Sequence, residues 1–92
     1  ICDVVGRHYG VTMAQLVSPR RQEYIAHARM MALTLCAELL RRGTVAIAEA
    51  FQRHHGMVTH ARRAIADWRS LRAANEAVYQ KLRAACEAAL IP

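Results

Sequence analysis

The chain has 92 residues, which is enough for one domain with a modest hydrophobic core, and we expect a single domain over residues 1–92. Its composition is 54% apolar but only 5% aromatic, and no stretch alternates apolar and polar side chains as half-buried strands do, which favours an all-α fold. The formal net charge is +6, and twelve of the thirteen basic residues are Arg. An anionic partner is implied, with a solvated basic face that binds nothing as the alternative.

Several classes of protein do not fit this composition. The longest apolar run, residues 30–40, is interrupted by Thr34 and Glu38 and is shorter than the ~20 residues that a membrane span requires. No signal peptide opens the chain. The three Cys are odd in number and far apart, unlike a disulfide framework or a structural zinc site, so we expect a reducing cytoplasmic location. Because the chain begins at Ile1 rather than Met, we expect it to be part of a longer protein or to lack upstream residues.

The first two elements are expected to be short. Residues 1–9 place apolar side chains at helical spacing and predict a helix, which Gly10 closes as a C-terminal cap. Thr12 is then placed to cap a short turn that runs to Val17.

A long central helix is predicted next. Ser18 followed by Pro19 is the signature of an N-cap and first helical position, so the helix should run from Arg20. Arg41 and Arg42 would meet the negative end of its dipole before Gly43 stops it. Its apolar stripe has steps of three and four residues and consists of Ile25, Ala28, Ala32, Leu35, Cys36 and Leu39.

The second half of the chain predicts three more helices. Thr44 caps a short helix over residues 45–51, a turn follows at Gln52 and Arg53, and a longer helix begins near His54 or His55. One face of that helix is expected to be buried and the other to face outward; the first carries Val58, Ala61, Ile65 and Trp68, and the second Thr59, His60, Arg62 and Arg63. The closing helix covers residues 75–90, with an apolar stripe of Val78, Leu82, Ala85 and Cys86 or Ala89. We expect Tyr24 and Trp68 to be core residues.

A short helix, a tight turn and a longer helix with a basic outer face form a helix-turn-helix layout. The start of the longer helix has unpaired N–H groups and a partial positive charge, both of which attract a phosphate. Its first residues would enter the major groove of a DNA duplex. The candidate DNA-binding residues are Arg20, Arg21, Arg53, His54, His55, Gly56, Met57, Thr59, His60, Arg62 and Arg63.

The sequence also resembles a known family. The segment "ICDVVGRHYGVTMAQLVSPRRQEYIAHARMMALTLCAELL", followed by "VAIAEAF" and "HHGMVTHARRAI", is similar to the C-terminal duplex-binding domain (domain IV) of the bacterial replication initiator DnaA. The resemblance spans roughly residues 1–72 and implies a compact all-α domain of about five to six helices with a helix-turn-helix of the Trp repressor and DnaA type. In that family an Arg opening the long helix reaches into the minor groove, and it matches Arg21 here.

The resemblance implies duplex DNA binding, a nucleoid-associated location and a role in replication initiation, but the signature departs from the family's. There it reads Gly-Gly-Arg-Asp-His-Thr-Thr-Val, whereas here one turn residue is missing, His54 replaces the Asp, and Gly56 and Met57 replace two Thr. Arg53, His55 and Val58 are retained. Three base-reading side chains are therefore lost, and we expect recognition of DnaA-box-like or origin sites to be altered or relaxed. The family's ATPase motif does not occur in the chain.

Other functions fit less well. His54, His55 and His60 do not share a helix face at metal-binding spacing, and no group of residues has the spacing of a catalytic site, so we expect no metal, no cofactor and no enzymatic activity. One alternative is a protein-interaction module that keeps the fold but has lost DNA reading, which an exposed Met57 would favour. Acidic phospholipid is a further possible partner, provided that a broad apolar face stays exposed.

Overall fold

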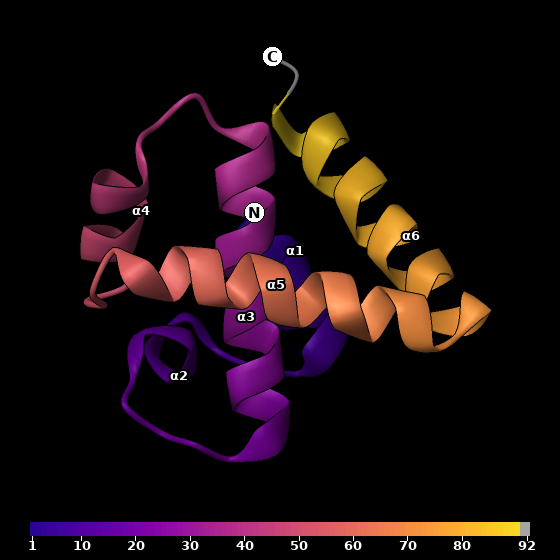
Figure 1. The fold of residues 1–92 in the computed structure, drawn as a ribbon, viewed down its shortest axis with the longest axis horizontal. Coiled ribbons are helices and arrows are strands. Elements are labelled where there is room, and N and C mark those ends of the chain that lie inside the picture. Colours follow the sequence, from indigo (N-terminus) through magenta and orange to yellow (C-terminus); the bar gives the residue numbers. More distant parts are fainter. Residues whose placement is uncertain (91–92) are drawn as a thin grey trace.

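The computed structural model describes residues 1–90 of the chain, so the last two residues of the predicted domain lie outside the described part. Within these residues there are six helices and no strands, which confirms the all-α prediction (Figure 1). In chain order they are α1 (Cys2–Tyr9), α2 (Met13–Val17), α3 (Glu23–Leu39), α4 (Thr44–Ala50), α5 (Gly56–Leu71) and α6 (Ala73–Leu90). No helix between residues 1 and 90 combines the length and the apolar character needed to cross a lipid bilayer.

Helix α3 is the centre of the fold and contacts each of the other five helices. Figure 1 shows α5 crossing in front of α3, with α4 and α6 on either side and α1 behind. Every residue from Met31 to Cys36 is buried, so α3 is covered on nearly all sides rather than along the predicted stripe alone. Each fully buried large apolar side chain contributes about 1.5–3 kcal/mol to folding, and α3 supplies many of them.

The chain between α1 and α2 follows the prediction. Gly10 adopts the left-handed conformation, with φ 67° and ψ 38°, and caps α1. Thr12 forms a capping box with Gln15, since the Thr12 hydroxyl accepts from the Gln15 N–H and the Gln15 side chain accepts from the Thr12 N–H. Gly6 is buried where α1 meets the turn, and a Cβ at this position would lie 2.5 Å from the Val11 carbonyl oxygen.

The predicted start of α3 is wrong. Ser18 ends α2 instead of beginning α3: its N–H and hydroxyl both donate to the Gln15 carbonyl, and its backbone is extended, as is usual for a residue before proline. Residues 18–22 form an extended loop, and α3 begins only at Glu23. The helix is therefore shorter at its N-terminal end, and Arg20 and Arg21 lie in the loop.

The predicted end of α3 also lies too far along the chain. Leu40 is extended and packs against the core, so α3 ends at Leu39 and the exposed Arg41 and Arg42 lie beyond it. Gly43 is the N-cap of α4 rather than the stop of α3, and Thr44 is the first residue of α4 rather than its cap.

Most of the predicted apolar faces of the last three helices are confirmed. In α4, Ile47, Ala48 and the following Phe51 are buried, while Val45 is 55% exposed. In α5, Val58, Ala61 and Ile65 are buried and Trp68 packs half-buried on the core. In α6, which begins at Ala73, Leu82 and Cys86 are buried and Val78 is half-buried.

Two predicted core positions, Ala85 and Tyr24, are wrong. Ala85 is exposed, and of the alternatives Cys86 and Ala89 it is Cys86 that is buried. Tyr79, which the sequence pattern did not indicate, is the large buried side chain of α6. Tyr24 is 51% exposed, because Ile25 and Ala28 rather than Tyr24 face the core at the start of α3.

Candidate nucleic-acid interface

The turn between α4 and α5 is closed by backbone hydrogen bonds. The Arg53 N–H donates to the Ala48 carbonyl at 2.9 Å, and the Gln52 N–H donates to the Glu49 carbonyl at 3.0 Å. With Gln52 left-handed at φ 55°, this pattern is a Schellman motif. Gln52 occupies a conformation that usually favours Gly, and the turn sets the direction in which α5 leaves α4.

The first turn of α5 is capped from outside the helix. His54 Nδ1 accepts from the Gly56 N–H at 3.1 Å, and the His54 and His55 carbonyls accept from the next two N–H groups. The His54 ring also stacks on His55, with 4.1 Å between the ring centroids. A side chain at Gly56 would crowd this cap, since its Cβ would lie 3.2 Å from His54 Nδ1. One imidazole nitrogen of His54 therefore stabilises the helix start.

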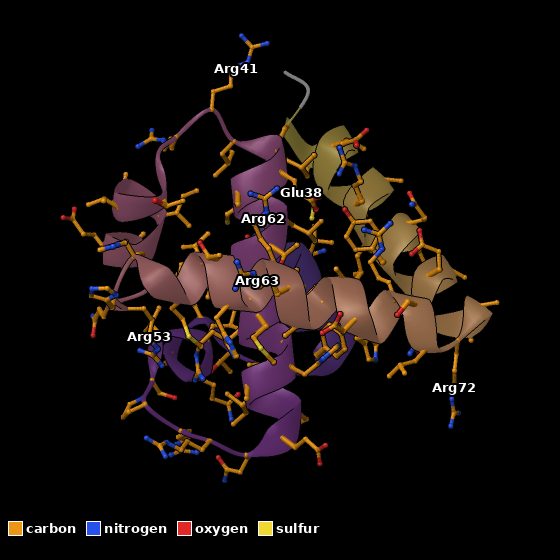
Figure 2. All side chains as sticks on the ribbon, viewed as in Figure 1. Glu38, Arg41, Arg53, Arg62, Arg63 and Arg72 are labelled. Atoms are coloured by element: carbon orange, nitrogen blue, oxygen red, sulfur yellow. The ribbon has the colours of Figure 1, made fainter. Side chains whose placement is uncertain are left out.

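Arg53 connects this turn to the loop before α3. Its Nη1 donates to the carbonyls of Val17, Phe51 and Gln52 at 3.3 Å each, and its Nη2 donates to the Ser18 carbonyl. The guanidinium is thus engaged with backbone oxygens from two segments far apart in the sequence. In Figure 2, Arg53 lies at the start of α5, between that helix and α2.

Arg29 holds the same loop from inside the protein. It is only 4% exposed, and its guanidinium donates to four backbone carbonyls: Leu16 and Ser18 at 2.7 Å, Arg20 at 3.1 Å and Gln15 at 3.2 Å. Two of these carbonyls end α2, where the helix dipole is negative and stabilises a cation. Burial, and to a lesser extent the nearby Arg53 charge, lower the pKa of Arg29.

The sequence analysis did not single out Arg29 as important for the interface. Its spacing could have indicated it, because Arg29 lies one turn after Ile25 and one turn before Ala32 on the apolar stripe of α3. A charged residue at a core position needs polar partners in the interior, and the carbonyls of a neighbouring helix end provide them.

The contacts of Arg29 and Arg53 bring part of the candidate set together. Arg29 and Arg53 both donate to the Ser18 carbonyl, so residues 18–22 are held against the turn that precedes α5. Arg20 and Arg21 follow directly and are exposed. The basic loop and the start of α5 therefore lie next to each other, although helices α3 and α4 lie between them in the sequence.

The outer face of α5 carries the remaining candidates. Thr59, His60, Arg62 and Arg63 are exposed, as predicted. Figure 2 shows Arg62 and Arg63 extending from the middle of α5, with Arg62 over the C-terminal half of α3. Met57 is half-buried and packs against the core, so the exposed Met57 that would favour a protein-docking surface is not observed.

Ion pairs divide the Arg residues into two groups. Among residues 1–90, the salt bridges join Arg69 to Glu76 at 2.5 Å, and Arg83 to Glu38 and Glu87 at 3.6 and 2.9 Å. The Arg69 guanidinium holds the pKa of Glu76 down at about 2. None of these bridges involves the candidate residues, whose Arg side chains have no carboxylate partner in the described part of the chain.

Two other exposed Arg side chains lie away from the start of α5. Figure 2 places Arg41 beyond the end of α3 and Arg72 below the junction of α5 and α6. The described residues also contain no group of three His, Cys, Asp or Glu side chains arranged to hold a metal ion. The surface around the turn before α5 thus combines a basic loop, a capped helix start and free guanidinium groups.

A comparison with protein families gives a match over most of the chain. The model described as "Bacterial dnaA protein helix-turn-helix" matches residues 1–65 of the 92. The match covers α1 to α4 and the first ten residues of α5, including every candidate residue. Helix α6 lies outside it.

Proposed function

The chain belongs to the bacterial DnaA helix-turn-helix family, whose members bind duplex DNA, and from this premise we propose that it reads duplex sites through the start of α5 and the loop before α3. In this proposal α5 lies in the major groove with His55, Gly56, Thr59 and His60 facing the bases. Arg21 reaches the adjacent minor groove, and Arg20, Arg62 and Arg63 contact phosphates.

The observation that carries the proposal is the anchoring of the basic loop to the α4–α5 turn. Arg53 donates to carbonyls of the segment before α3 and of the α4–α5 turn, and Arg29 donates to the same loop from the core side. A rigid link of this kind fixes the spacing between a minor-groove Arg and a major-groove helix before DNA arrives. Binding then costs less conformational entropy. Arg53 acts here mainly as a positioning residue, since its Nη1 and Nη2 groups both donate to backbone carbonyls.

We propose that specificity is shifted from that of a DnaA box. His54 uses Nδ1 to cap α5, which leaves its other nitrogen to meet the duplex as a neutral donor. An Asp at this position would accept from cytosine, whereas an imidazole N–H donates to acceptors such as guanine O6 or N7. Gly56 offers no side chain, and the half-buried Met57 offers little surface. The preferred site would therefore have fewer specified positions.

Selection of bound duplexes from a random pool tests this function, with a DnaA-box duplex as comparator. Enrichment of one motif, related to the box but changed at the positions read by His54 to Met57, is the expected result. Recovery of no duplex above background would refute the DNA-reading proposal and would favour a protein-docking module. Equal retention of all sequences would reduce the function to non-specific binding.

Variants at two exposed Arg residues sharpen the test. Arg21→Ala should weaken binding to the selected site by about 1–3 kcal/mol and binding to random duplex by less. Arg72→Ala is the matched control, because Arg72 is exposed and lies at the opposite end of α5. Equal losses for Arg21→Ala on both duplexes would make Arg21 a backbone contact.

A further inference from the structure

A cavity of about 360 Å³ lies where α5 crosses α3, on the side of α5 facing the C-terminal half of α3. Its polar lining consists of Thr34 and Glu38 from α3 and Thr59, Arg62, Arg63 and Arg69 from α5. In Figure 2, Arg62 and Arg63 rise from α5 in front of α3, with Glu38 near Arg62. Thr59, Arg62 and Arg63 also belong to the proposed DNA-binding surface, whereas Thr34, Glu38 and Arg69 do not.

Thr34 is the unusual residue of this cavity. Its side chain is 4% exposed, and Oγ1 is buried without a hydrogen-bond partner in the part of the chain that the structure describes. Buried hydroxyl groups are almost always hydrogen-bonded, because an unpaired one loses its bonds to water and gains nothing in return. Thr34 also lines the cavity, so an acceptor bound there would give this hydroxyl a partner.

The acidic residue in the lining is already neutralised. Glu38 accepts a hydrogen bond from the Tyr79 hydroxyl and lies 3.6 Å from Arg83. Arg69 is likewise committed, since it pairs with Glu76 and stacks over the Tyr79 ring at 3.7 Å from the centroid. Glu38 and Arg69 are therefore held by partners within the protein on the α6 side of the cavity.

Arg62 and Arg63 have no carboxylate partner among residues 1–90. Three Arg and one Glu line the cavity, which gives a net lining charge of +2. The cavity therefore attracts an anion, and its free donors are two guanidinium groups and the Thr34 and Thr59 hydroxyls. A phosphate has several acceptor oxygens that can accept from a hydroxyl and from a guanidinium fork at once.

We propose that this α3–α5 cavity binds a phosphate group, with Thr34 Oγ1 and the Arg62 guanidinium as its donors and Arg63 at the rim. The cavity volume of about 360 Å³ is much larger than the ~30 Å³ that one water molecule occupies, so the cavity can hold a phosphate and some of its hydration water. The phosphate belongs either to a small molecule or to the backbone of a bound duplex. The proposal concerns the free protein and does not require that α5 read bases.

The test is a titration of the whole chain with inorganic phosphate, followed by the backbone amide signals of α3 and α5 in nuclear magnetic resonance spectra. Sodium chloride at matched ionic strength is the reference. Phosphate should produce saturable shifts around Thr34, Thr59 and Arg62 that chloride does not produce. Absence of saturable, phosphate-specific shifts at these residues would overturn the proposal.

Three variants identify the donors. Thr34→Val and Arg62→Gln should each raise the dissociation constant for phosphate about 10-fold, because each removes a hydrogen bond to a charged ligand. Thr34→Ser keeps the hydroxyl and should retain the affinity, which separates a lost donor from a disturbed fold. Arg41→Gln is the control, since Arg41 is exposed and lies away from the cavity. Equal affinities in Thr34→Val, Arg62→Gln and Arg41→Gln would contradict the assignment.

A second titration, with saturating duplex, separates the two sources of phosphate. If the cavity is filled by the DNA backbone, duplex will abolish the phosphate-induced shifts, and Arg62→Gln will also weaken duplex binding. If it takes a small phosphate compound, the shifts will persist in the complex. A protein that binds phosphate but no duplex would refute the proposed function and leave the cavity assignment intact.

Discussion

Replacement of Arg29 by Met removes the buried guanidinium while keeping an unbranched side chain in the core. Four carbonyls then lose Arg29 as a donor, although the Ser18 carbonyl still accepts from Arg53 and the Gln15 carbonyl from Ser18. Two of these bonds, to Leu16 and Ser18, measure 2.7 Å, and the two longer ones share Nη2 with the Ser18 bond. Counting only the two short bonds at about 1.5 kcal/mol each, we expect the free energy of unfolding to fall by about 3 kcal/mol.

Removal of the desolvation cost of the buried cation acts in the opposite direction. Burial lowers the pKa of Arg29, which shows that the charged form is held at a cost. The cost does not cancel the loss, because the Leu16 carbonyl stays buried without this donor in the variant. The free energy of unfolding of Arg29→Lys should lie between those of the natural sequence and Arg29→Met. An ammonium keeps the charge but cannot donate to several carbonyls at once as the planar guanidinium does.

Two measurements test the expectation. Urea unfolding should show a lower midpoint with an unchanged slope, as expected for a loss of stability without a change in the surface exposed. Limited trypsin digestion should cut after Arg20 and Arg21 faster in Arg29→Met, because residues 18–22 have lost their anchor. Arg41→Met, at an exposed position, should stay within about 0.5 kcal/mol of the natural sequence. A loss below about 1 kcal/mol together with an unchanged cleavage rate would refute the anchoring role of Arg29.

Three further outcomes follow from the structure. Thr34→Val should raise the free energy of unfolding by about 1 kcal/mol in phosphate-free buffer, measured by urea unfolding, because it removes an unpaired buried hydroxyl; a loss of stability would mean that Oγ1 has a partner. Burial lowers the pKa of His27 from its ordinary 6.5, with Glu23 acting in the opposite direction, so the unfolded chain binds the proton more readily and stability should fall as the pH drops below about 6.5. The melting temperature should depend less on pH in His27→Gln than in the natural sequence. Identical pH dependences in the two proteins would exclude His27 as the cause. Gly10→Ala should cost about 1 kcal/mol through its left-handed backbone alone, since its Cβ meets nothing within 4 Å. Gly6→Ala should cost clearly more, because its Cβ would meet the Val11 carbonyl at 2.5 Å, and equal costs in urea unfolding would contradict this close packing.

The parts of the fold that the sequence predicted are those governed by local rules. Gly10 and the Thr12 capping box involve residues at most a few positions apart, and the buried face of α5 follows helical periodicity. The order of elements and the outward position of the basic side chains on α5 follow from the same rules. The family resemblance added the relation between the basic loop and the helix-turn-helix.

The failures occur where tertiary contacts decide the local structure. Ser18 and Pro19 have the signature of a helix start, yet Arg29 and Arg53 take the Ser18 carbonyl from outside the segment and hold it extended. Neither contact is visible in a local window, because the donors lie 11 and 35 residues away. Leu40 likewise leaves the helix because it packs on the core in an extended conformation. The buried Tyr79 depends on Glu38 and Arg83 as polar partners for its hydroxyl.

The structure also changes the salt dependence expected for DNA binding. The sequence places ten Arg residues between positions 18 and 72, and ten phosphate contacts would give a slope of log affinity against log salt of roughly −9. Arg29 and Arg53 donate to backbone carbonyls, and Arg69 is paired with Glu76. Arg41 and Arg72 lie away from the start of α5, and Arg42 follows Arg41 in the segment beyond the end of α3. The three proposed phosphate contacts, of Arg20, Arg62 and Arg63, give a slope of about −2.7 at roughly 0.9 per contact. Fluorescence anisotropy with a short duplex at several salt concentrations measures this slope. A slope near −9 would mean that guanidinium groups bonded within the free protein contact DNA phosphates in the complex. An affinity independent of salt would show that no phosphate contacts form.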